Sequence, residues 1–405
     1  MSMMPVQDAI DVMLSQVSPL VATEHLGLAA ALGRVLASDI RAEVTVPAFD
    51  NSAMDGYALR AVEAVPGNTL PLAGTALAGH AFEGAVPANN CVRITTGAVL
   101  PEGLDTVVMQ EQVEQAGQGI RLLHAPKPGE HVRKAGEDIA PGQLVLSKGQ
   151  RLSAVDLGLL ASIGQAEVTV HRQIKAAVFS TGDELIAPGQ PLPAGHLYDS
   201  NRVVLTAMLK RLDCDVLDLG LLPDKPEAIR QAILQASDEA DVLITSAGVS
   251  VGDADYTRQL LSELGDIGFW KVAMKPGKPF AFGSLGTCWF FGLPGNPVAA
   301  VATMDVLVQP VLRRLAGEPM AMLRQQPLAA VSAETLRKTP GRADFQRGFY
   351  QQLDGQLQVK PVGRQSSAVL SGAAKANCYI ALEQERGPVA AGEKVHILPF
   401  YQMLR

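Results

Sequence analysis

The chain has 405 residues, more than one typical hydrophobic core can hold, which predicts about two to four domains. Hydrophobic residues make up 47% of it, and the formal net charge of −7 is spread along the chain without a charged tail. This charge distribution lacks the concentrated positive charge of a nucleic-acid-binding protein, and it favours an enzyme that acts on small molecules.

The cysteines and histidines give no sign of a disulfide framework or a transition-metal site. The four cysteines are far apart, with no C-x-x-C pair, so we expect reduced and mostly buried thiols. The seven histidines form no i, i+4 pair and lack a neighbouring Cys or Glu partner. Metal catalysis based on histidine is therefore not expected.

The first residues, "MSMMPVQDAIDVMLSQV", repeat apolar positions at helical spacing and contain Asp8 and Asp11 without a basic segment. This pattern is typical of a helix and not of a signal peptide. The chain has no run of about 18 apolar residues, so we expect no membrane span and no membrane partner. The cytoplasm is the expected location.

The N-terminal part predicts a discontinuous domain with an insertion. A helical segment is expected over 6–37 and a second helix over 153–164, and these two are expected to pack together. Residues 46–139 between them are rich in Gly and Pro, with short strand-like runs. We therefore predict a helical or extended linker domain from 1–45 and 140–173, with a β-rich domain inserted at 46–139.

Residues 174–326 alternate strands and helices, which predicts a parallel sheet covered by helices on both faces. Ser200 and Asp224 stand where the N-caps of the first two helices are expected, and Pro226 lies in the first turn of the second. In such sheets ligands collect at the carboxyl ends of the strands. The expected strands are 176–180, 215–220, 241–245 and 287–293, the helices 201–212, 225–237, 256–265 and 297–315, and 269–283 is hairpin-like.

The last part, 327–405, turns to strands and predicts a β-barrel-like domain. Residues 342–362 read as two strands joined at Asp354-Gly355, a strong hairpin signal. The fold class is thus α/β and multidomain: a central parallel-sheet domain, a β-rich insertion, the N-terminal linker domain and the C-terminal β domain.

Three strand ends in the central domain share one kind of loop, at 179–185, 245–255 and 292–300. Each has glycines that allow close backbone approach, together with hydroxyl or amide groups. A single such loop is often only a tight connection, but three in one domain favour a phosphate or nucleotide cradle. None matches a P-loop or a dinucleotide-binding fingerprint. The candidate binding residues are Ser180, Thr181, Gly182, Asp183, Ser246, Gly248, Ser250, Gly252, Pro294, Gly295, Asn296 and Pro297.

Carboxylates follow these hydroxyls, which is unexpected beside an anion. Acidic groups that converge on phosphate usually share a divalent cation with it, because Mg²⁺ binds oxygen ligands of both. We therefore predict Mg²⁺ near these carboxylates, which are Asp183 and Glu184, Asp224, and Asp253 and Asp255. In the alternative interpretation, Asp224 caps a helix and Asp253 is a solvated loop charge.

Two further groups of residues fit an oxyanion. "KPGKP" at 275–279 places Lys275 and Lys278 around a restrained turn, from which both can project to one side. In the C-terminal domain, Arg342 and Arg347 with Ser366 and Ser367 are another candidate anion group. Surface lysines on a hairpin and ordinary polar turns are the alternatives.

Taken together and in order, the motifs "FDNSAMDGYA", "RITTGA", "GEDI", "FSTGDEL", "SAGVSVGDADY", "KPGKPFAFG" and "GLPGNPV" resemble the molybdopterin molybdenumtransferase family, which includes bacterial MoeA and the E domain of gephyrin. The match covers essentially the whole chain. The resemblance implies that adenylylated molybdopterin receives molybdate and AMP is released in a Mg²⁺-dependent reaction. It also implies a molybdopterin-binding-like central domain and a homodimer with its active site between subunits.

The resemblance assigns roles to residues. Asp55, Thr96 and Asp138 match functional positions of the inserted domain and would approach the site from the partner subunit. Glu184, Asp224 and Asp255 match acidic positions of the family, and each would hold either Mg²⁺ or the attacking water. The resemblance does not assign these two roles among the three residues. Lys275, Lys278, Arg342 and one of the two serines Ser366 and Ser367 would bind molybdate. The sequence does not distinguish molybdate from tungstate. An enzyme that makes adenylylated molybdopterin and molybdoenzyme acceptors are the implied partners.

Two positions depart from the family pattern. Ala247 stands where the family loop usually has its first glycine, which adds a methyl group near the ligand. Ala299 stands where Ser is common after Gly-Asn-Pro-Val, so a hydroxyl is missing. These departures affect fine binding geometry more than the reaction.

Two other functions remain as alternatives. One is a binding or scaffold protein that carries the pterin without chemistry. The other is a different Mg²⁺-dependent nucleotide hydrolase, which would draw only on the Gly-rich loops and leave the flanking domains unexplained.

Overall fold

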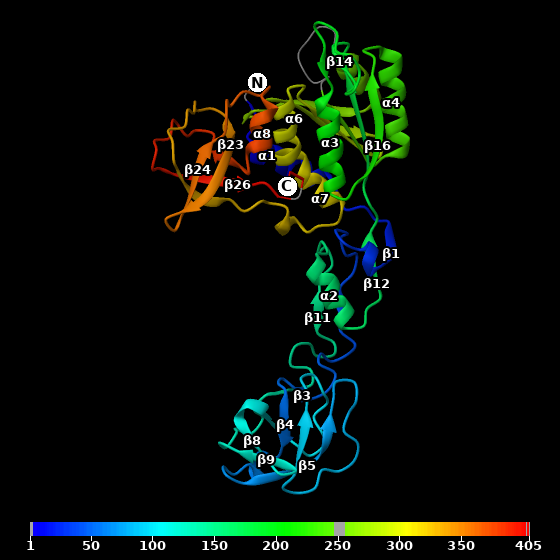
Figure 1. Cartoon of the computed structure of the whole chain (residues 1–405). Coiled ribbons are helices and arrows are strands. Elements are labelled where there is room, and N and C mark those ends of the chain that lie inside the picture. The colour runs from blue at the N-terminus through cyan, green and yellow to red at the C-terminus, as the bar shows by residue number, and fades with distance from the viewer. Residues whose placement is uncertain (1–2, 247–255, 402, 405) are drawn as a thin grey trace.

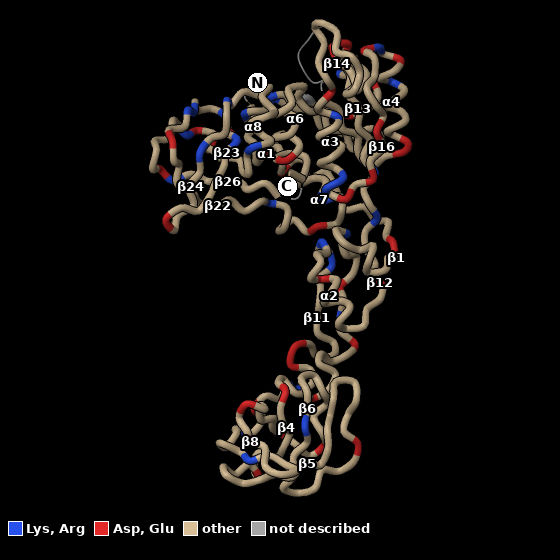
Figure 2. The backbone as a smooth tube through the Cα atoms, in the orientation of Figure 1, with Lys and Arg blue, Asp and Glu red and all other residues tan. Residues whose placement is uncertain are grey.

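A computed structural model describes residues 3–246, 256–401 and 403–404. The chain is elongated: the α/β domain and the C-terminal barrel lie side by side, a narrow linker extends from the α/β domain, and the inserted β domain lies at the far end of that linker (Figure 1). Lys and Arg alternate with Asp and Glu along the whole tube (Figure 2). In the described part of the chain, no helix is long and apolar enough to cross a membrane.

The central sheet has six strands in the order β16-β13-β17-β21-β20-β18, of which the first four run parallel, β20 runs antiparallel to β21, and β18 runs antiparallel to β20. The inner strands β13 and β17 are buried on both faces, as their continuous apolar runs predict, whereas the edge strand β16 is partly exposed. Ala176 and Val178 of β13 face a core shared with α3, α6 and α7, whereas Ala177 and Phe179 face α4 and α5. The elements are β13 (Lys175–Thr181), β16 (Asp215–Leu222), β17 (Val242–Ser246), β18 (Asp266–Lys271), β20 (Pro279–Leu285), β21 (Cys288–Leu293), α3 (Ser200–Arg211), α4 (Pro226–Glu239), α5 (Tyr256–Leu264), α6 (Pro297–Thr303) and α7 (Gln309–Leu315).

Both expected N-caps of this domain are wrong by one residue. Helix α3 is capped by Asp199, whose carboxylate accepts a hydrogen bond from the backbone N–H of Arg202, and Ser200 is the first helical residue. Helix α4 starts behind Lys225, which makes no side-chain cap bond, so Asp224 does not cap it. The sequence places polar residues near a helix start, but only the local backbone angles decide which one is the cap.

The N-terminal segment is α-helical only over α1 (Val6–Gln16), with one 3-10 turn at Leu28–Ala30, so the expected helix over 6–37 is wrong beyond residue 16. Pro19 follows, and the chain then forms β1 (Thr23–Gly27), which pairs antiparallel with β12 (Glu167–His171). Helix α1 packs against α7 in the core of the α/β domain. Residues between 26 and 42 share a core with α2 (Ala154–Ser162), but α1 belongs to the other core, so the expected packing of two helices is wrong.

The inserted domain is a six-stranded sheet in the order β7-β4-β6-β5-β9-β8. Short pairs, β2 with β11 and β3 with β10, connect it to the linker. The strands of the sheet are β4 (Gly56–Leu59), β5 (Thr69–Ala76), β6 (Cys91–Ile94), β7 (Thr106–Met109), β8 (Val113–Ala116) and β9 (Gly119–Leu122). The strands of the short pairs are β2 (Ile40–Arg41), β3 (Asn51–Ser52), β10 (Val132–Arg133) and β11 (Leu144–Leu146).

The C-terminal domain is a closed barrel, because β23 pairs with both β24 and β25 while β22 and β26 complete the ring. Its hairpin turns at Asp354 and Gly355, both with positive φ, as predicted. The strands are β22 (Leu328–Ser332), β23 (Ala343–Leu353), β24 (Gln356–Pro361), β25 (Cys378–Leu382) and β26 (Lys394–Pro399), with a short helix α8 (Leu370–Lys375).

Two sequence expectations concern smaller features. The four cysteines are free and buried, as expected. The helix expected over 297–315 is one continuous run, but it contains a π-helical segment, Met304–Val308, between α6 and α7. Such segments are uncommon and often lie near functional sites.

Candidate active site

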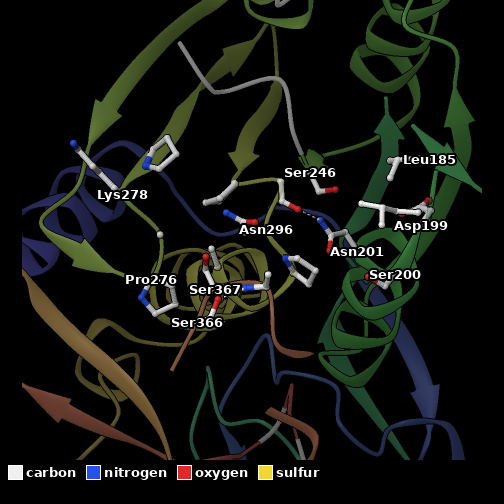
Figure 3. A pocket seen from close by; sticks show the side chains of 18 of the residues that line it. Leu185, Asp199, Ser200, Asn201, Ser246, Pro276, Lys278, Asn296, Ser366 and Ser367 are labelled. Atoms are coloured by element: carbon white, nitrogen blue, oxygen red, sulfur yellow. Dashed lines mark hydrogen bonds between the residues drawn. The ribbon is translucent and has the colours of Figure 1, made fainter. Parts of the chain in front are cut away.

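A cavity of about 1030 Å³ lies between the carboxyl ends of the α/β strands and the C-terminal barrel (Figure 3). This volume is at the upper end of the roughly 300–1,000 Å³ range of small-molecule sites. One wall comes from the loops after β13 and β21 and from Ser246 at the end of β17, and the opposite wall from Arg342 and residues 365–368 of the barrel domain. The described strand ends therefore converge on one cavity, as their position in a parallel sheet predicts.

Direct backbone pairing joins the two domains at this cavity. The short strand β19 (Met274–Lys275) leaves the α/β domain and pairs parallel with β23 of the barrel. On the other side, the N–H of Val298 in α6 donates to the carbonyl of Ser367 at 3.0 Å. These bonds fix "KPGKP" and the loop 364–368 relative to each other without a ligand.

Three cationic side chains line the cavity: Lys275 and Lys278 come from one turn, and Arg342 comes from the barrel domain. The Nζ of Lys275 lies 3.1 Å from the Oδ2 of the buried Asp344, so its charge is partly offset. Lys278 is exposed and Arg342 is half-buried. Ser366 and Ser367 lie at the same end of the cavity as Lys278 (Figure 3). The two anion groups expected from the sequence are therefore parts of one site.

Arg347, a candidate for the same group, is not in the cavity lining. Its side chain is buried, and its guanidinium donates to the carbonyls of Arg364 and Ser366. Burial lowers the pKa of Arg347. Gln365 bonds to the backbone of the same residue through both its amide atoms. Arg347 thus shapes the serine loop from behind instead of lining the cavity.

The hydroxyls of the cradle lie at different depths. Ser180 and Ser246 are register partners on β13 and β17, with their Oγ atoms 3.4 Å apart. Ser180 is fully buried and its hydroxyl donates to Asp199, so it supports the wall and does not line the cavity. Ser246 and Thr181 do line the cavity. At the third strand end Pro294, Gly295, Asn296 and Pro297 line it as well, as does Ala299 without a hydroxyl.

The carboxylates after β13 and β16 come together beside the cavity. The hydroxyl of Thr181 donates to Asp224 at 3.3 Å, and the N–H of Asp224 points to the carboxylate of Asp183 at 3.3 Å. Glu184 lines the cavity. Its carboxylate lies close to Gly182, which has a φ of 151°, and a Cβ at position 182 would be 2.7 Å from the Oε2 of Glu184. Within the described residues, no group of three His, Cys, Asp or Glu side chains could hold a metal.

Some lining residues were not identified from the sequence. Leu185, Leu197 and Tyr198 come from the two short strands β14 (Leu185–Ile186) and β15 (Leu197–Tyr198). Asn201 is buried and its amide donates to the carbonyl of Gly295 at 2.7 Å. The only available signal was the polar run "YDSNR" at 198–202, which was interpreted as a helix start.

The inserted domain contributes nothing to this cavity within one chain (Figure 1). Asp55 and Thr96 are nevertheless brought together, since the backbone N–H and the hydroxyl of Thr96 donate to Asp55 at 2.7 and 3.0 Å. These bonds hold the pKa of Asp55 below its usual value. Asp138 is exposed. Gly248, Ser250, Gly252, Asp253 and Asp255, together with Ala247, lie outside the described residues.

Three protein-family models match the chain along its length. Residues 4–164 match the MoeA N-terminal region (domain I and II), residues 177–314 a probable molybdopterin binding domain, and residues 329–400 the MoeA C-terminal region (domain IV).

Curated proteins and solved structures are similar over the same length. The chain is 47% identical over 404 residues to the molybdopterin molybdenumtransferase of Haemophilus influenzae, covering 99% of this chain and 100% of that protein. It is 36% identical to the molybdopterin molybdenumtransferase of a Nostoc species, covering 93% of this chain and 88% of that protein. The crystal structure of a molybdopterin biosynthesis moeA protein from Pyrococcus horikoshii superposes with a TM-score of 0.85 at 26% identity, covering 98% and 100%.

Proposed function

The chain belongs to the molybdopterin molybdenumtransferase (MoeA) family, and we propose that it inserts molybdate into adenylylated molybdopterin and releases AMP in a Mg²⁺-dependent reaction. The observation that carries this proposal is one cavity lined by Lys275, Lys278 and Arg342 and by groups from three strand ends, namely Thr181 and Glu184, Ser246, and residues 294–297. The proposed location is the cytoplasm.

The cationic end suits a tetrahedral dianion. Lys278 and Arg342 come from different domains but line the same cavity, so both positive charges would attract an oxyanion bound between them. The hydroxyls of Ser366 and Ser367 add donors, and the buried Arg347 holds their loop in place. In this proposal molybdate is a substrate bound there, and the sulfurs of the pterin receive the metal.

The strand-end loops suit the phosphoanhydride of the second substrate. Thr181, Ser246 and the segment 294–297 line the cavity with hydroxyl and backbone groups. Gly182 does not line the cavity, and the carboxylate of Glu184 occupies the space that a Cβ there would need. The phosphate oxygens would therefore bind to the hydroxyls and to the backbone of segment 294–297.

The donors present fit Mg²⁺ in chemistry. Mg²⁺ prefers oxygen ligands and usually binds through one or two carboxylates together with substrate phosphates and waters, so a complete protein cage is not required. Glu184 and Asp224 would hold the ion, with Asp255 as the third expected ligand outside the described residues. Bound there, Mg²⁺ would neutralise charge on the anhydride.

In the proposed mechanism, a carboxylate of Glu184 or Asp224 orients a water and accepts its proton. The water oxygen forms a bond to a phosphorus of the anhydride, the bridging P–O bond breaks, and AMP leaves as the other phosphate stays on the pterin. Thr181 holds Asp224 through its hydroxyl, which keeps that carboxylate in place. The lysines compensate the negative charge that builds up.

The inserted domain takes part only if two copies associate. We propose a homodimer in which Asp55, Thr96 and Asp138 of a second copy complete the cavity, because none of them lines it within one chain and the inserted domain lies at the far end of the linker (Figure 1). The proposed partners are the enzyme that supplies adenylylated molybdopterin and the molybdoenzymes that accept the product.

The test is a direct assay of AMP release with purified protein, adenylylated molybdopterin, Mg²⁺ and molybdate. We expect release that depends on molybdate and falls at least tenfold in Lys278→Ala, whereas Lys271→Ala, an exposed lysine on β18, serves as the matched control and stays at the wild-type rate. Pterin binding without any molybdate-dependent AMP release would instead support a scaffold protein.

A further inference from the structure

The cavity has a second, apolar end that the oxyanion chemistry does not use. It is formed by a flap, residues 185–198, whose two stems are β14 and β15. The flap exposes large apolar side chains: Leu192 is 47% exposed, Leu197 63% and Tyr198 44%. Exposed leucines beside a cavity are unfavourable in free energy while no ligand covers them, and such surfaces usually mark a binding site.

Leu185 and Leu197 form one wall of that end. They are register partners in a parallel pair, so their side chains point to the same side, and both line the cavity. Leu185 lies at the opposite end of the cavity from Lys278 and Pro276 (Figure 3). The cavity therefore has a cationic end and, opposite it, an apolar wall of two leucines beside the polar residues Asp199, Ser200 and Asn201.

The wall is held in place without a ligand. The N–H of Leu197 donates to the carbonyl of Glu184 at 2.8 Å, and the N–H of Asp199 donates to the carbonyl of Ile186 at 2.9 Å. The carboxylate of Asp199 is buried and anchored by Ser180 and Arg202. At the tip of the flap, the hydroxyl of Tyr198 donates to the carbonyl of Gln190 at 2.9 Å.

We propose that Leu185 and Leu197 form a subsite for the face of a planar nitrogen heterocycle of the substrate. This inference rests on the proposed function and adds where the two substrates lie in the cavity: the heterocycle of adenylylated molybdopterin on the flap, and molybdate between the cations. A flat ring buries its face on two leucines, while Ser200 and Asn201, which line the same cavity, offer polar groups to its edge. A purely apolar ligand would leave those polar groups without partners.

Two heterocycles have this shared chemistry, the pterin and the adenine of the same substrate. Three probes are therefore used. Binding of pterin is measured by its fluorescence and binding of AMP by calorimetry, and molybdate tests the cationic end. The variants are Leu185→Ala and Leu197→Ala, and the matched control is Leu192→Ala, an exposed leucine of the same flap that does not line the cavity.

We expect Leu185→Ala and Leu197→Ala each to weaken binding of one heterocycle by roughly tenfold, because the ring then buries less apolar surface against the flap, and to leave molybdate binding unchanged. Leu192→Ala should bind all three probes like the wild type. The weakened probe, pterin or AMP, identifies which ring occupies the subsite. Leu185→Met, which keeps an apolar side chain of similar volume, should restore binding.

Unchanged affinity for both pterin and AMP in the two alanine variants overturns the subsite. So does an equal loss of molybdate binding, which indicates general damage to the cavity. If the wild type binds pterin through Leu197 but shows no molybdate-dependent AMP release, the subsite stands and the proposed reaction fails. If AMP release is present and the alanine variants keep the wild-type KM, the reaction stands and the subsite fails.

Discussion

The ammonium of Lys275 lies 3.1 Å from the carboxylate of Asp344, across the junction between the α/β domain and the barrel. The two residues are also register partners of β19 and β23. Asp344 is buried, whereas the side chain of Lys275 is 43% exposed towards the cavity. A buried negative charge therefore places this lysine and at the same time reduces the positive potential of the oxyanion end.

Asp344→Asn should raise the affinity for molybdate by roughly threefold to tenfold, since it removes a negative charge but keeps an oxygen that can accept from Lys275. The gain should be largest at low ionic strength, because salt screens the charges. Isothermal titration with molybdate measures it. Asp354→Asn, an exposed turn carboxylate on the distant hairpin of the same barrel, is the control. A fall in affinity would show that Asp344 acts mainly by positioning Lys275.

Thr181→Val should lower the kcat of AMP release about tenfold or more, because Asp224 loses the hydroxyl that bonds to it. Valine has nearly the same shape, so the fold should persist. Single-turnover kinetics and a melting curve together check both statements. An unchanged kcat would remove the Thr181–Asp224 bond from the mechanism.

Thr245→Val on the neighbouring strand β17 is the matched control for that substitution. Thr245 is fully buried, and in the described part of the chain its hydroxyl has no hydrogen-bond partner. Replacing a buried, unsatisfied hydroxyl by a methyl group should leave activity unchanged and raise stability by up to about 1 kcal/mol. Chemical denaturation measures the free energy of unfolding, and a marked loss would indicate a partner that Thr245 bonds.

Mixing two inactive variants tests the proposed dimer. Asp55→Ala disables the inserted domain and Glu184→Ala the α/β domain, so each alone should lose most AMP release. If an active site combines the two domains from different copies, a mixed dimer contains one intact site, and random mixing should recover about a quarter of wild-type activity. Recovery requires subunit exchange, which a mass spectrum of the mixture verifies. With exchange established, no recovery would place each site within one chain.

Asp305 in the π-helical segment predicts a dependence of stability on pH. Burial raises the pKa of its carboxyl from 3.8 to about 7, so between these two pH values the folded protein retains a proton that the unfolded chain has lost. The contribution of Asp305 to stability is therefore fully present below the pKa of the unfolded chain, and it decreases as the pH rises through the pKa of the folded protein. The same carboxyl faces Tyr379 of the barrel, whose pKa is raised by burial and then by Asp305.

Asp305→Asn should consequently melt higher than the wild type at about pH 8, with an advantage roughly 2–4 °C larger than at about pH 5. Calorimetric melting curves at both values provide the comparison. A constant difference between the two proteins at the two pH values would show that Asp305 titrates alike in the folded and unfolded chains.

The alternation of elements followed from local pattern. Apolar runs bounded by glycine located β13, β17 and β21, helical spacing located α3 and α4, and Asp354-Gly355 located the turn of the barrel hairpin. These features depend on residues within a few positions of each other, so the sequence alone contains them. The convergence of the strand-end loops also followed, because parallel strands end at one edge.

The tertiary structure decided the contacts between distant segments. The sequence predicts both Lys275 and Asp344 as polar residues but not the ion pair between them, 69 positions apart, because that contact depends on how two domains are joined. For the same reason Arg347 could be grouped with Arg342, although one is buried behind the serine loop and the other lines the cavity. Leu185 and Leu197 were ordinary leucines in the sequence until the fold placed both on one side of the cavity.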